Sequence, residues 1–424
     1  MSKKANSFQT PIGTRDIQAD AAARRRALSG IFAEEADLAG YGELETPIFE
    51  DIGVFQRIGE GTDVVRKEMY EFTDKGDRRM ALRPEGTAAV CRSFVQQRPT
   101  TPWKVWYQGP FFRYEAPQAG RYRQFEQIGT EVLGSADADV DVEVIALASR
   151  VISRVGLSRV LLVINSIGEP EDRRNYVEVL SEYLGGRIGD LDPADRDKVA
   201  THPLRVLDSK KAATRSVVDG APVITDFLSA ESRAHFDRVQ EGLGALGIPF
   251  AIEPRLVRGL DYYSGTTFEF QASALEAAQN TICGGGRYNG LVEQLGGPPT
   301  PGIGFAMGVD RLLLACDAEG TFPAPNRNVD VWVVDVTDGA SARDLTHLLR
   351  ASGISADRSF DSRSMRSQMK AADRSGAALA VIIGDQELAD DMVAIRRLRE
   401  ISDQILVPRS EMVDRVRSML PEPT

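Results

Sequence analysis

A proline- and asparagine-rich segment, EGTFPAPNRN at residues 319–328, divides the 424-residue chain into two parts with different hydrophobic patterns. After it, short apolar runs alternate with amphipathic stretches, which predicts a small α/β domain with a mostly parallel sheet. Before it, long strand patterns and helical patterns suggest an antiparallel sheet with helices to one side. Because one core rarely extends over so many residues, we expect two domains, at 1–322 and 329–424.

Composition and charge exclude several classes of protein. Hydrophobic residues make up 42% and charged residues 27% of the chain, which is ordinary for a globular protein. Neither a long apolar run nor an apolar signal core occurs, so we expect no membrane contact and a cytoplasmic location. The formal net charge of −11 opposes non-specific binding of nucleic acid, which would need a local basic face.

Cysteine and histidine do not indicate a metal site. The three cysteines and three histidines are scattered along the chain, without the spacing of a disulfide framework or a zinc site. A Ser-His-Asp triad is equally unsupported. We therefore expect no resident metal, and we expect the chemistry to depend on arginine, glutamate, tyrosine and bound ions.

A long antiparallel hairpin with a basic tip is predicted by WKVWYQGPFFRYE and RQFEQIGTEVLG. Side chains alternate along a strand. Two sets therefore each share a face: Phe111 with Arg113, and Phe125 with Gln127 and Glu131. A guanidinium, a ring, an amide and a carboxylate on one surface suit a nucleotide and an amino acid. A solvated hairpin face with one exposed aromatic residue is the alternative.

Two further positions have both a structural and a functional interpretation. MYEFTDKGDRRMALRP predicts two strands around a Lys-Gly-Asp turn, and EGTAAVCRSFVQQ a helix after them. Thr87 is a plausible N-cap of that helix, with Glu85 complementing its dipole. Arg311 in GVDRLLLA is either an arginine extending from an amphipathic helix to solvent or, given the glycines nearby, a ligand contact.

The stretch LVRGLDYYSGTTFEF, residues 256–270, reads as a buried strand that contains charged residues. Buried charge is costly unless it is paired or used. Arg258 could form a structural ion pair with Asp261, and the tyrosines could be core residues. Arginine and glycine followed by Tyr262 and Tyr263 in one strand nevertheless favour a functional site. Residues of about 170–250 are charged and helical in pattern, which predicts an inserted helical module.

Together these segments resemble a bacterial-type histidyl-tRNA synthetase, a class II aminoacyl-tRNA synthetase. LVRGLDYY and GGGRYNGL are similar to the two histidine-specific motifs of that family. FFRYEAPQAGRYRQFEQIGTE and PGIGFAMGVDRLLL resemble class II motifs two and three, and GYGELETPIFE resembles motif one. PIGTRDI matches the N-terminal segment of the family. The resemblance covers nearly the whole chain and keeps the order of the motifs.

The resemblance implies an α+β fold and a reaction. The fold is an antiparallel class II sheet with flanking helices and a helical insertion, followed by an α/β anticodon-binding domain. The reaction is ATP-dependent ligation of L-histidine to tRNA(His) through histidyl-adenylate, with Mg²⁺ on the outer phosphates. A homodimer formed through motif one is also implied. The alternative, a synthetase-like regulatory subunit of ATP phosphoribosyltransferase, lacks an anticodon domain.

The resemblance also implies roles for individual residues. Arg113 and Arg258 would be the catalytic cations at the α-phosphate, and Glu131 and Tyr263 would bind the imidazole nitrogens. The wider set for histidine is Glu85, Gly86, Thr87, Gln127, Glu131, Tyr262 and Tyr263. The set for ATP is Arg113, Phe125, Arg258 and Arg311. The set for tRNA is Gln118, Arg121 and Arg123 in motif two, with Arg363, Arg366 and Lys370 in the second domain.

A local basic face is available in the second domain. Residues 343–374 carry seven basic and four acidic side chains, against a net negative charge for the whole chain. Arg363, Arg366 and Lys370 follow one another at helical spacings of three and four residues, so they would lie close together. A solvated helix surface is the alternative to an RNA contact.

Overall fold

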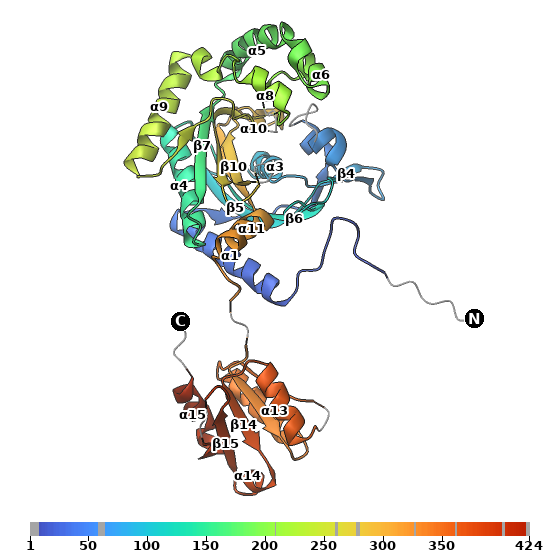
Figure 1. The fold of residues 1–424 in the computed structure, drawn as a ribbon, viewed down its shortest axis with the longest axis vertical. Coiled ribbons are helices and arrows are strands. Elements are labelled where there is room, and N and C mark those ends of the chain that lie inside the picture. Colours follow the sequence, from blue (N-terminus) through green and yellow to red (C-terminus); the bar gives the residue numbers. More distant parts are fainter. Residues whose placement is uncertain are drawn as a thin grey trace, which may run out of the picture. The chain divides into compact units, whose positions relative to one another are not determined.

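The computed structural model describes residues 8–57, 64–207, 209–258, 262–276, 280–325, 328–360, 363–400 and 403–420. The chain forms two compact units, Met1–Ala324 and Pro325–Thr424, which are considered separately (Figure 1). Within the described residues, no helix is both long and apolar enough to cross a membrane.

An eight-stranded sheet forms the centre of the first unit, with strand order β1-β5-β6-β11-β10-β9-β7-β8. All neighbouring strands are antiparallel except the two outermost pairs, β1 with β5 and β7 with β8. The predicted hairpin is present, because β5 and β6 pair from Trp103 opposite Leu133 to Phe112 opposite Gln124. The strands are β1 Gly42–Glu43, β5 Trp103–Phe112, β6 Gln124–Leu133, β7 Val160–Ser166, β8 Ala251–Ile252, β9 Ser264–Ala272, β10 Thr281–Arg287 and β11 Gly302–Gly308.

Helices cover both faces of this sheet, and each face has its own apolar core. On one face α1, α4, α9 and α11 pack against residues such as Ile128 and Phe305. On the other face α2, α3 and α10 pack around Tyr107, Phe111 and Tyr288. Tyr107 and Tyr288 of the second core also line the cavity described below. The helices are α1 Ala19–Leu38, α2 Ile52–Gln56, α3 Thr87–Gln97, α4 Ala138–Arg154, α9 Ala230–Ala245, α10 Leu291–Gln294 and α11 Val309–Glu319.

A separate three-stranded sheet, in the order β2-β4-β3, lies beside the start of α3. Its strands are β2 Phe49–Asp51, β3 Glu71–Thr73 and β4 Arg79–Leu82, and the π-helical turn η1 Val64–Glu68 precedes β3. The expected pair of strands around the Lys-Gly-Asp turn is thus confirmed, since β3 and β4 pair antiparallel.

The helical insertion is shorter than the sequence pattern suggested. Helices α5 Pro170–Gly185, α6 Pro193–Thr201, α7 Leu204–Leu207 and α8 Ala212–Val218 share a core of their own with the short turn η3 Ile224–Phe227. The turn η2 Ile188–Asp190 lies between α5 and α6 in the chain and is not part of that core. Helix α9 belongs to the main unit instead. Its buried residues Phe236, Val239 and Leu243 pack with α4 against the sheet. Both segments are charged and helical in sequence, so pattern alone could not separate them.

A buried ion pair fastens the sheet to α4. Arg287, the last residue of β10, donates from Nε to both carboxylate oxygens of Asp141 at 3.0 and 2.9 Å. Its other nitrogens donate to the carbonyls of Ser135 at 3.0 Å and Asp137 at 2.6 Å. His235 of α9 lies 3.2 Å from the same carboxylate. Every polar group of the pair therefore has a partner, which is the condition for keeping two charges away from water.

The second unit is a five-stranded sheet in the order β13-β12-β14-β15-β16. The prediction of a mostly parallel sheet was wrong, because β14, β15 and β16 pair antiparallel and only β13, β12 and β14 are parallel. Helices α12 and α15 pack on one face, while Met369 of α13 packs on the other. The elements are β12 Val331–Asp335, α12 Ala340–Ala351, β13 Ala356–Arg358, α13 Met365–Arg374, β14 Leu379–Ile383, α14 Asp385–Ala389, β15 Met392–Arg397, β16 Ile405–Pro408, η4 Arg409–Glu411 and α15 Met412–Met419.

Candidate active site

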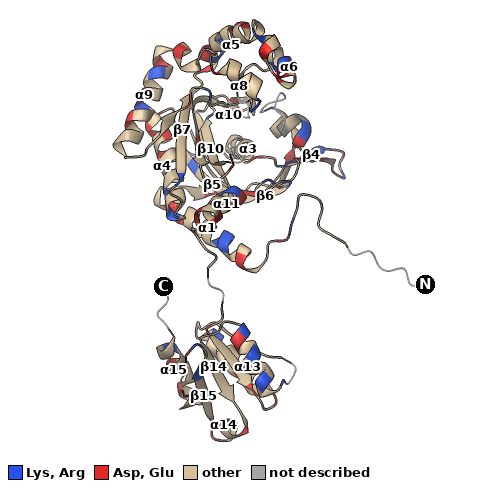
Figure 2. Ribbon diagram, viewed as in Figure 1, with Lys and Arg blue, Asp and Glu red and all other residues tan. Residues whose placement is uncertain are grey.

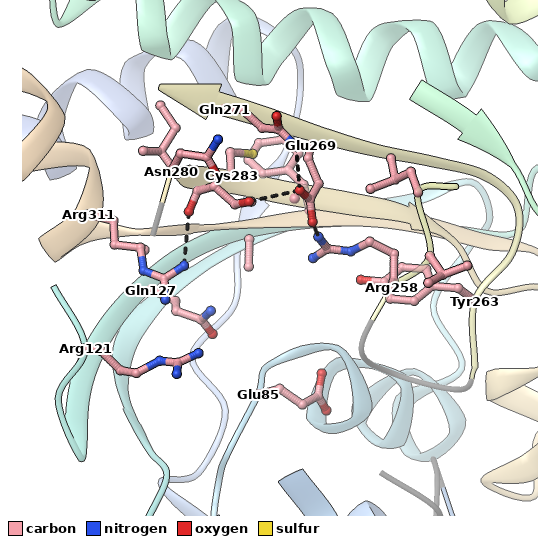
Figure 3. A pocket seen from close by; sticks show the side chains of 18 of the residues that line it. Glu85, Arg121, Gln127, Arg258, Tyr263, Glu269, Gln271, Asn280, Cys283 and Arg311 are labelled. Atoms are coloured by element: carbon pink, nitrogen blue, oxygen red, sulfur yellow. Dashed lines mark hydrogen bonds and ion pairs between the residues drawn. The ribbon is translucent and has the colours of Figure 1, made fainter. Parts of the chain in front are cut away.

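A cavity of about 940 Å³ opens above the central strands β6, β9, β10 and β11. The N-terminal end of α3, the loop between β5 and β6, and the start of α11 complete its walls. Residues of the insertion, such as Arg215 of α8, line it as well. Figure 3 shows Arg121 and Arg311 on one side of the cavity and Arg258 with Tyr263 on the other.

Arg113, the residue after β5, and Phe125 of β6 meet at the cavity wall. The Nε of Arg113 donates to the carbonyl of Pro84 at 2.9 Å, and its Cζ lies 5.3 Å from the centre of the Phe125 ring. Gln127 follows on the same face of β6 and also lines the cavity. Phe111, which was expected on the ligand face, is instead buried in the core beneath Arg83.

Arg258 lies before β9 and not within it, because the strand begins at Ser264. The expectation of one continuous strand over residues 256–270 was therefore wrong. Arg258 forms an ion pair with Glu269 of β9, while Asp261, the partner considered from sequence, lies outside the described residues. A Cβ on Gly284 would lie 2.6 Å from the guanidinium nitrogens of Arg258, so glycine at this position makes room for the arginine.

Arg311 is the third residue of α11 and donates from Nη1 to the carbonyl of Thr281 at 3.2 Å. Burial lowers the pKa of its guanidinium, and the neighbouring guanidiniums of Arg121 and Arg113 lower it further. Arginine stays charged even so. The structure therefore gathers positive charge at one end of the cavity, which suits a polyphosphate.

Glu85 caps α3, and this corrects the expected capping residue. Its two oxygens accept from the backbone N–H groups of Thr87 and Ala88, both at 2.8 Å. Thr87 is the first helical residue, and its hydroxyl donates instead to Glu131 at 2.7 Å. Gly86 lies between them, where a Cβ would be 2.5 Å from the ring of Tyr107. Burial raises the pKa of Glu85, although the two backbone donors oppose that rise.

Glu131 lies on the same face of β6 as Gln127 but is buried behind the residues that line the cavity. Three hydroxyls reach its carboxylate: Thr87 at 2.7 Å, Tyr288 at 2.5 Å and Tyr107 at 3.4 Å. A Cβ on Gly304 of the neighbouring strand would overlap one carboxylate oxygen. Burial raises the pKa of Glu131 to about 8, although the hydrogen bonds from Tyr288 and Thr87 lower it.

Tyr262 and Tyr263 both line the cavity, with ring centres 4.7 Å apart. The Tyr262 hydroxyl lies 3.5 Å from a carboxylate oxygen of Glu85. The Tyr263 ring centre lies 5.8 Å from Cζ of Arg258. Tyr262 thus lies beside a buried carboxylate, and Tyr263 lies beside a cation of the cavity wall.

Residues 13–312 match a family model described as histidyl-tRNA synthetase, and residues 330–419 match one described as an anticodon binding domain. The chain belongs to the histidyl-tRNA synthetase family. It is similar to the histidine–tRNA ligase of Geobacillus kaustophilus, with 46% identity over 96% of this chain and 97% of the relative. For the histidine–tRNA ligase of Rhodococcus erythropolis, identity is 47% over 98% of this chain and 99% of the relative.

Solved structures agree with this assignment to the histidyl-tRNA synthetase family. The structure of apo histidyl-tRNA synthetase of S. aureus has a TM-score of 0.82 and 37% sequence identity to this chain. The match covers 97% of this chain and 100% of the S. aureus chain. A Bacillus halodurans structure described as an ATP phosphoribosyltransferase regulatory subunit/histidyl-tRNA synthetase has a TM-score of 0.62 and 23% identity, covering 84% and 93%. At that identity the second likeness concerns the fold alone.

Three residues of this histidyl-tRNA synthetase site were missed from sequence. Tyr288 and Tyr107 donate to Glu131, and Glu269 pairs with Arg258. Tyr288 stands within GGGRYNG, and Tyr107 precedes Phe111 by four residues, which is two strand periods, on the same face. Those patterns could have indicated Tyr107 and Tyr288. The partner of Arg258 could not be found in this way, because the pairing is a tertiary contact between Arg258, which precedes β9, and Glu269 within β9.

The residues predicted to meet tRNA lie in both units. Gln118 and Arg121 close a turn at the tip of the hairpin, and Arg121 pairs with Glu115 at 2.5 Å while also lining the cavity. Arg123 lies 3.8 Å from the centre of the Tyr114 ring. In the second unit, Arg366 and Lys370 are exposed on α13, whereas Arg363 precedes the helix (Figure 2).

The raised pKa of Glu131 predicts a pH effect on histidine use. A carboxyl group with a pKa of about 8 is mostly protonated at neutral pH. Above its pKa it is a carboxylate, which is a stronger acceptor for an imidazole N–H. We therefore expect kcat/KM for histidine, measured by ATP–pyrophosphate exchange, to rise as the pH increases from about 7 to about 9. The ionisation of free histidine near pH ~6.5 gives a separate, earlier step.

The variant Glu131→Gln provides the comparison. The variant should have a lower kcat/KM for histidine. Its pH profile should keep the step caused by ionisation of the substrate and should lose the increase at pH ~8. The kcat/KM for ATP serves as the internal control. A rise that persists in Glu131→Gln would show that another group titrates.

Proposed function

We propose that this member of the histidyl-tRNA synthetase family is a histidine–tRNA ligase, which joins L-histidine to tRNA(His) through histidyl-adenylate with ATP as a substrate. The observation that carries the proposal is one cavity with two chemically different ends. Arg121 and Arg311 line one end, Arg258 lies on the opposite side (Figure 3), and a buried carboxylate held by hydroxyls lies behind the cavity wall. As an enzyme of translation it would act in the cytoplasm.

The arginines would promote the first step. An oxygen of the histidine carboxylate attacks the α-phosphorus of ATP, the bond to the bridging oxygen breaks, and pyrophosphate leaves. Arg113, which follows β5, and Arg258, which precedes β9, both line the cavity. Preorganised cations at both sides of the phosphorus stabilise the charge that develops in the transition state. Phe125 would stack on adenine, and Arg311 would contact the outer phosphates.

The other end of the cavity would select the amino acid. Glu85, Thr87 and Gln127, with the intervening Gly86, would hold the ammonium group of the substrate. Tyr262 would lie beside the ring, while Glu131 and Tyr263 would bind the two imidazole nitrogens, one as acceptor and one as donor. A site made of paired polar groups strongly rejects analogues that lack the matching groups.

Magnesium fits the site as a companion of ATP. Within the described residues, no cluster of three or more His, Cys, Asp or Glu side chains could hold a metal ion by itself. Mg²⁺ on nucleotide phosphates needs only one or two protein carboxylates. Carboxylates that line the cavity would supply such a ligand. The ion would neutralise charge on the outer phosphates.

A role as a regulatory subunit of ATP phosphoribosyltransferase is less well supported. The cavity retains the arginines and carboxylates that adenylate chemistry needs, and the chain has a matched anticodon binding domain. Histidine-dependent exchange of pyrophosphate into ATP separates the two functions, because a binding module would not catalyse it.

The second unit would hold the anticodon of the tRNA. Arg366 and Lys370 are exposed one helical turn apart on α13. Nearby in sequence, the Phe360 ring is 60% exposed, with Cζ of Arg358 5.0 Å from its centre. Exposed rings flanked by arginine are typical platforms for unstacked RNA bases. Gln118, Arg121 and Arg123 would meet the acceptor end.

A homodimer is proposed through residues 40–50 and α1. Exposed apolar side chains occur on α1 and on the small sheet that contains β2. Leu38 is 80% exposed, and Phe49 and Phe72 are in edge contact, with ring centres 5.9 Å apart, although both are substantially exposed. Exposed apolar groups of this kind mark protein interfaces.

Arg258→Ala tests the catalytic assignment. Loss of one preorganised donor should raise the barrier by about 2.7–4 kcal/mol, so ATP–pyrophosphate exchange should fall roughly 10²–10³-fold. The change also leaves Glu269 buried without its cation. The double variant Arg258→Ala/Glu269→Gln removes that second effect. If the double variant recovers normal exchange, Arg258 is a structural residue.

Charge reversal on α13 tests the RNA surface. Arg366→Glu with Lys370→Glu should raise KM for tRNA and reduce the salt dependence of aminoacylation, since each lost phosphate contact lowers the slope by about 0.7–0.9. Histidine-dependent exchange should not change. Arg343→Glu, an exposed residue on α12, is the matched control. If the α13 variant and Arg343→Glu had equal effects, the cause would be the changed net charge of the domain and not an RNA contact on α13.

Phe49→Glu tests the dimer. A carboxylate in an apolar interface should favour the monomer, measured by light scattering over a range of concentrations. Leu246→Glu alters an equally exposed leucine after α9 and should leave the mass unchanged. A wild-type protein with the mass of a monomer at every concentration would refute the proposed interface.

A further inference from the structure

The segment PIGTRDI, residues 11–17, has no role in the proposed site, yet it contacts two elements that form the cavity wall. A turn begins the segment, where Thr14 donates to the carbonyl of Pro11 from its backbone N–H at 3.0 Å and from its hydroxyl at 2.7 Å. The turn directs Gly13 and Arg15 toward the loop between β5 and β6.

Gly13 joins the segment to that loop. Its carbonyl accepts from the backbone N–H of Arg123 at 2.8 Å. Gly13 has a φ of +81°, and a Cβ would lie 2.6 Å from Cγ of Arg123. Both the conformation and the close approach therefore require glycine. The backbone of Arg123 is held at the same time by Arg113, whose N–H donates to its carbonyl at 2.9 Å.

Arg15 connects the loop to α11. Its Cζ lies 3.6 Å from the centre of the Tyr122 ring, and its guanidinium forms an ion pair with Asp310. Asp310 is nearly buried and pairs with Arg25 of α1 as well. A planar guanidinium can stack on a ring and pair with a carboxylate at once, which lysine cannot do equally well.

Both partners of Arg15 are next to cavity arginines. Tyr122 follows Arg121 in the loop, and Asp310 precedes Arg311 in α11. All four residues line the cavity. Figure 3 shows Arg121 and Arg311 on the same side of it. Two guanidiniums placed this close repel each other, so the loop and α11 need a connection that resists their separation.

We propose that Arg15 is a positioning residue for ATP, because it fixes the distance between the loop that carries Arg121 and the helix that carries Arg311. The inference rests on the proposed ATP site. Arg15 itself is one residue removed from the cavity wall and acts through Tyr122 and Asp310. Its loss would let the loop and α11 move apart and weaken the hold of Arg311 on the outer phosphates.

The experiment compares Arg15→Ala, Arg15→Lys and Arg24→Ala by ATP–pyrophosphate exchange. Arg24 is a matched control, since it also pairs with a carboxylate of α11, Asp317, and lies 6.0 Å from an aromatic ring centre, Phe322. Its contacts are at the far end of the helix from the cavity. A misplacement of about 1 Å can cost ~10²-fold, so for Arg15→Ala we expect KM for ATP to rise on the order of tenfold.

The split between substrates identifies a positioning role. KM for histidine should remain within about twofold in Arg15→Ala, because Glu85, Thr87 and Glu131 lie at the other end. Arg15→Lys keeps the charge but loses most of the stack, so it should show an intermediate KM for ATP. Arg24→Ala should leave both KM values near those of the wild type.

Two results would overturn the inference. Equal rises in KM for ATP and histidine in Arg15→Ala, or matching effects of Arg15→Ala and Arg24→Ala, would reduce Arg15 to a packing residue. Arg311→Ala separates this failure from failure of the site. If Arg311→Ala raises KM for ATP and Arg15→Ala does not, only the role of Arg15 is wrong. If neither does, the proposed phosphate end of the cavity is wrong.

Discussion

The buried ion pair between Arg287 and Asp141 is the constraint on which the rest of the first unit depends. Breaking such a pair from one side typically costs about 3–5 kcal/mol, because the remaining charge stays buried. Arg287 ends β10, and the next residue, Tyr288, points to the opposite face and donates to Glu131. The pair therefore fixes the strand from one side of the sheet while the site is formed on the other.

The cavity combines two different electrostatic environments, one formed by arginine side chains and one formed by buried carboxyl groups. Arginines at one end keep their charge and raise the local positive potential. At the other end, burial makes ionisation of Glu131 and Glu85 harder, and hydroxyl and backbone donors offset only part of that effect. Gln127 and the two tyrosines line the same cavity, and two of its cations, Arg258 and Arg121, are paired with the carboxylates of Glu269 and Glu115.

Periodicity predicted the parts of the fold that follow from local sequence. The hairpin and the shared face of Phe125, Gln127 and Glu131 come from the two-residue repeat of a strand, and β5 and β6 have that arrangement. The wrong predictions concern tertiary contacts. Thr87 had the sequence of a helix cap, but the buried carboxylate of Glu131 needed its hydroxyl, and Glu85 took the cap instead. Helix α9 likewise looked like part of the insertion until its packing partner α4 was known.

The glycines of β10 and β11 have a consequence for how the protein could change over time. Gly284 leaves room for Arg258, and Gly304 for Glu131, so each is fixed by a side chain on another element. Glycine in a strand lowers stability by roughly 0.5–1 kcal/mol relative to alanine. Substitutions that would strengthen the middle of the sheet are therefore the ones that would fill the site. In a more heat-resistant variant, stabilising substitutions should therefore occur in the outer helices and not in these two strands. The centre of the sheet is the part of the enzyme whose stability is hardest to increase without loss of the site.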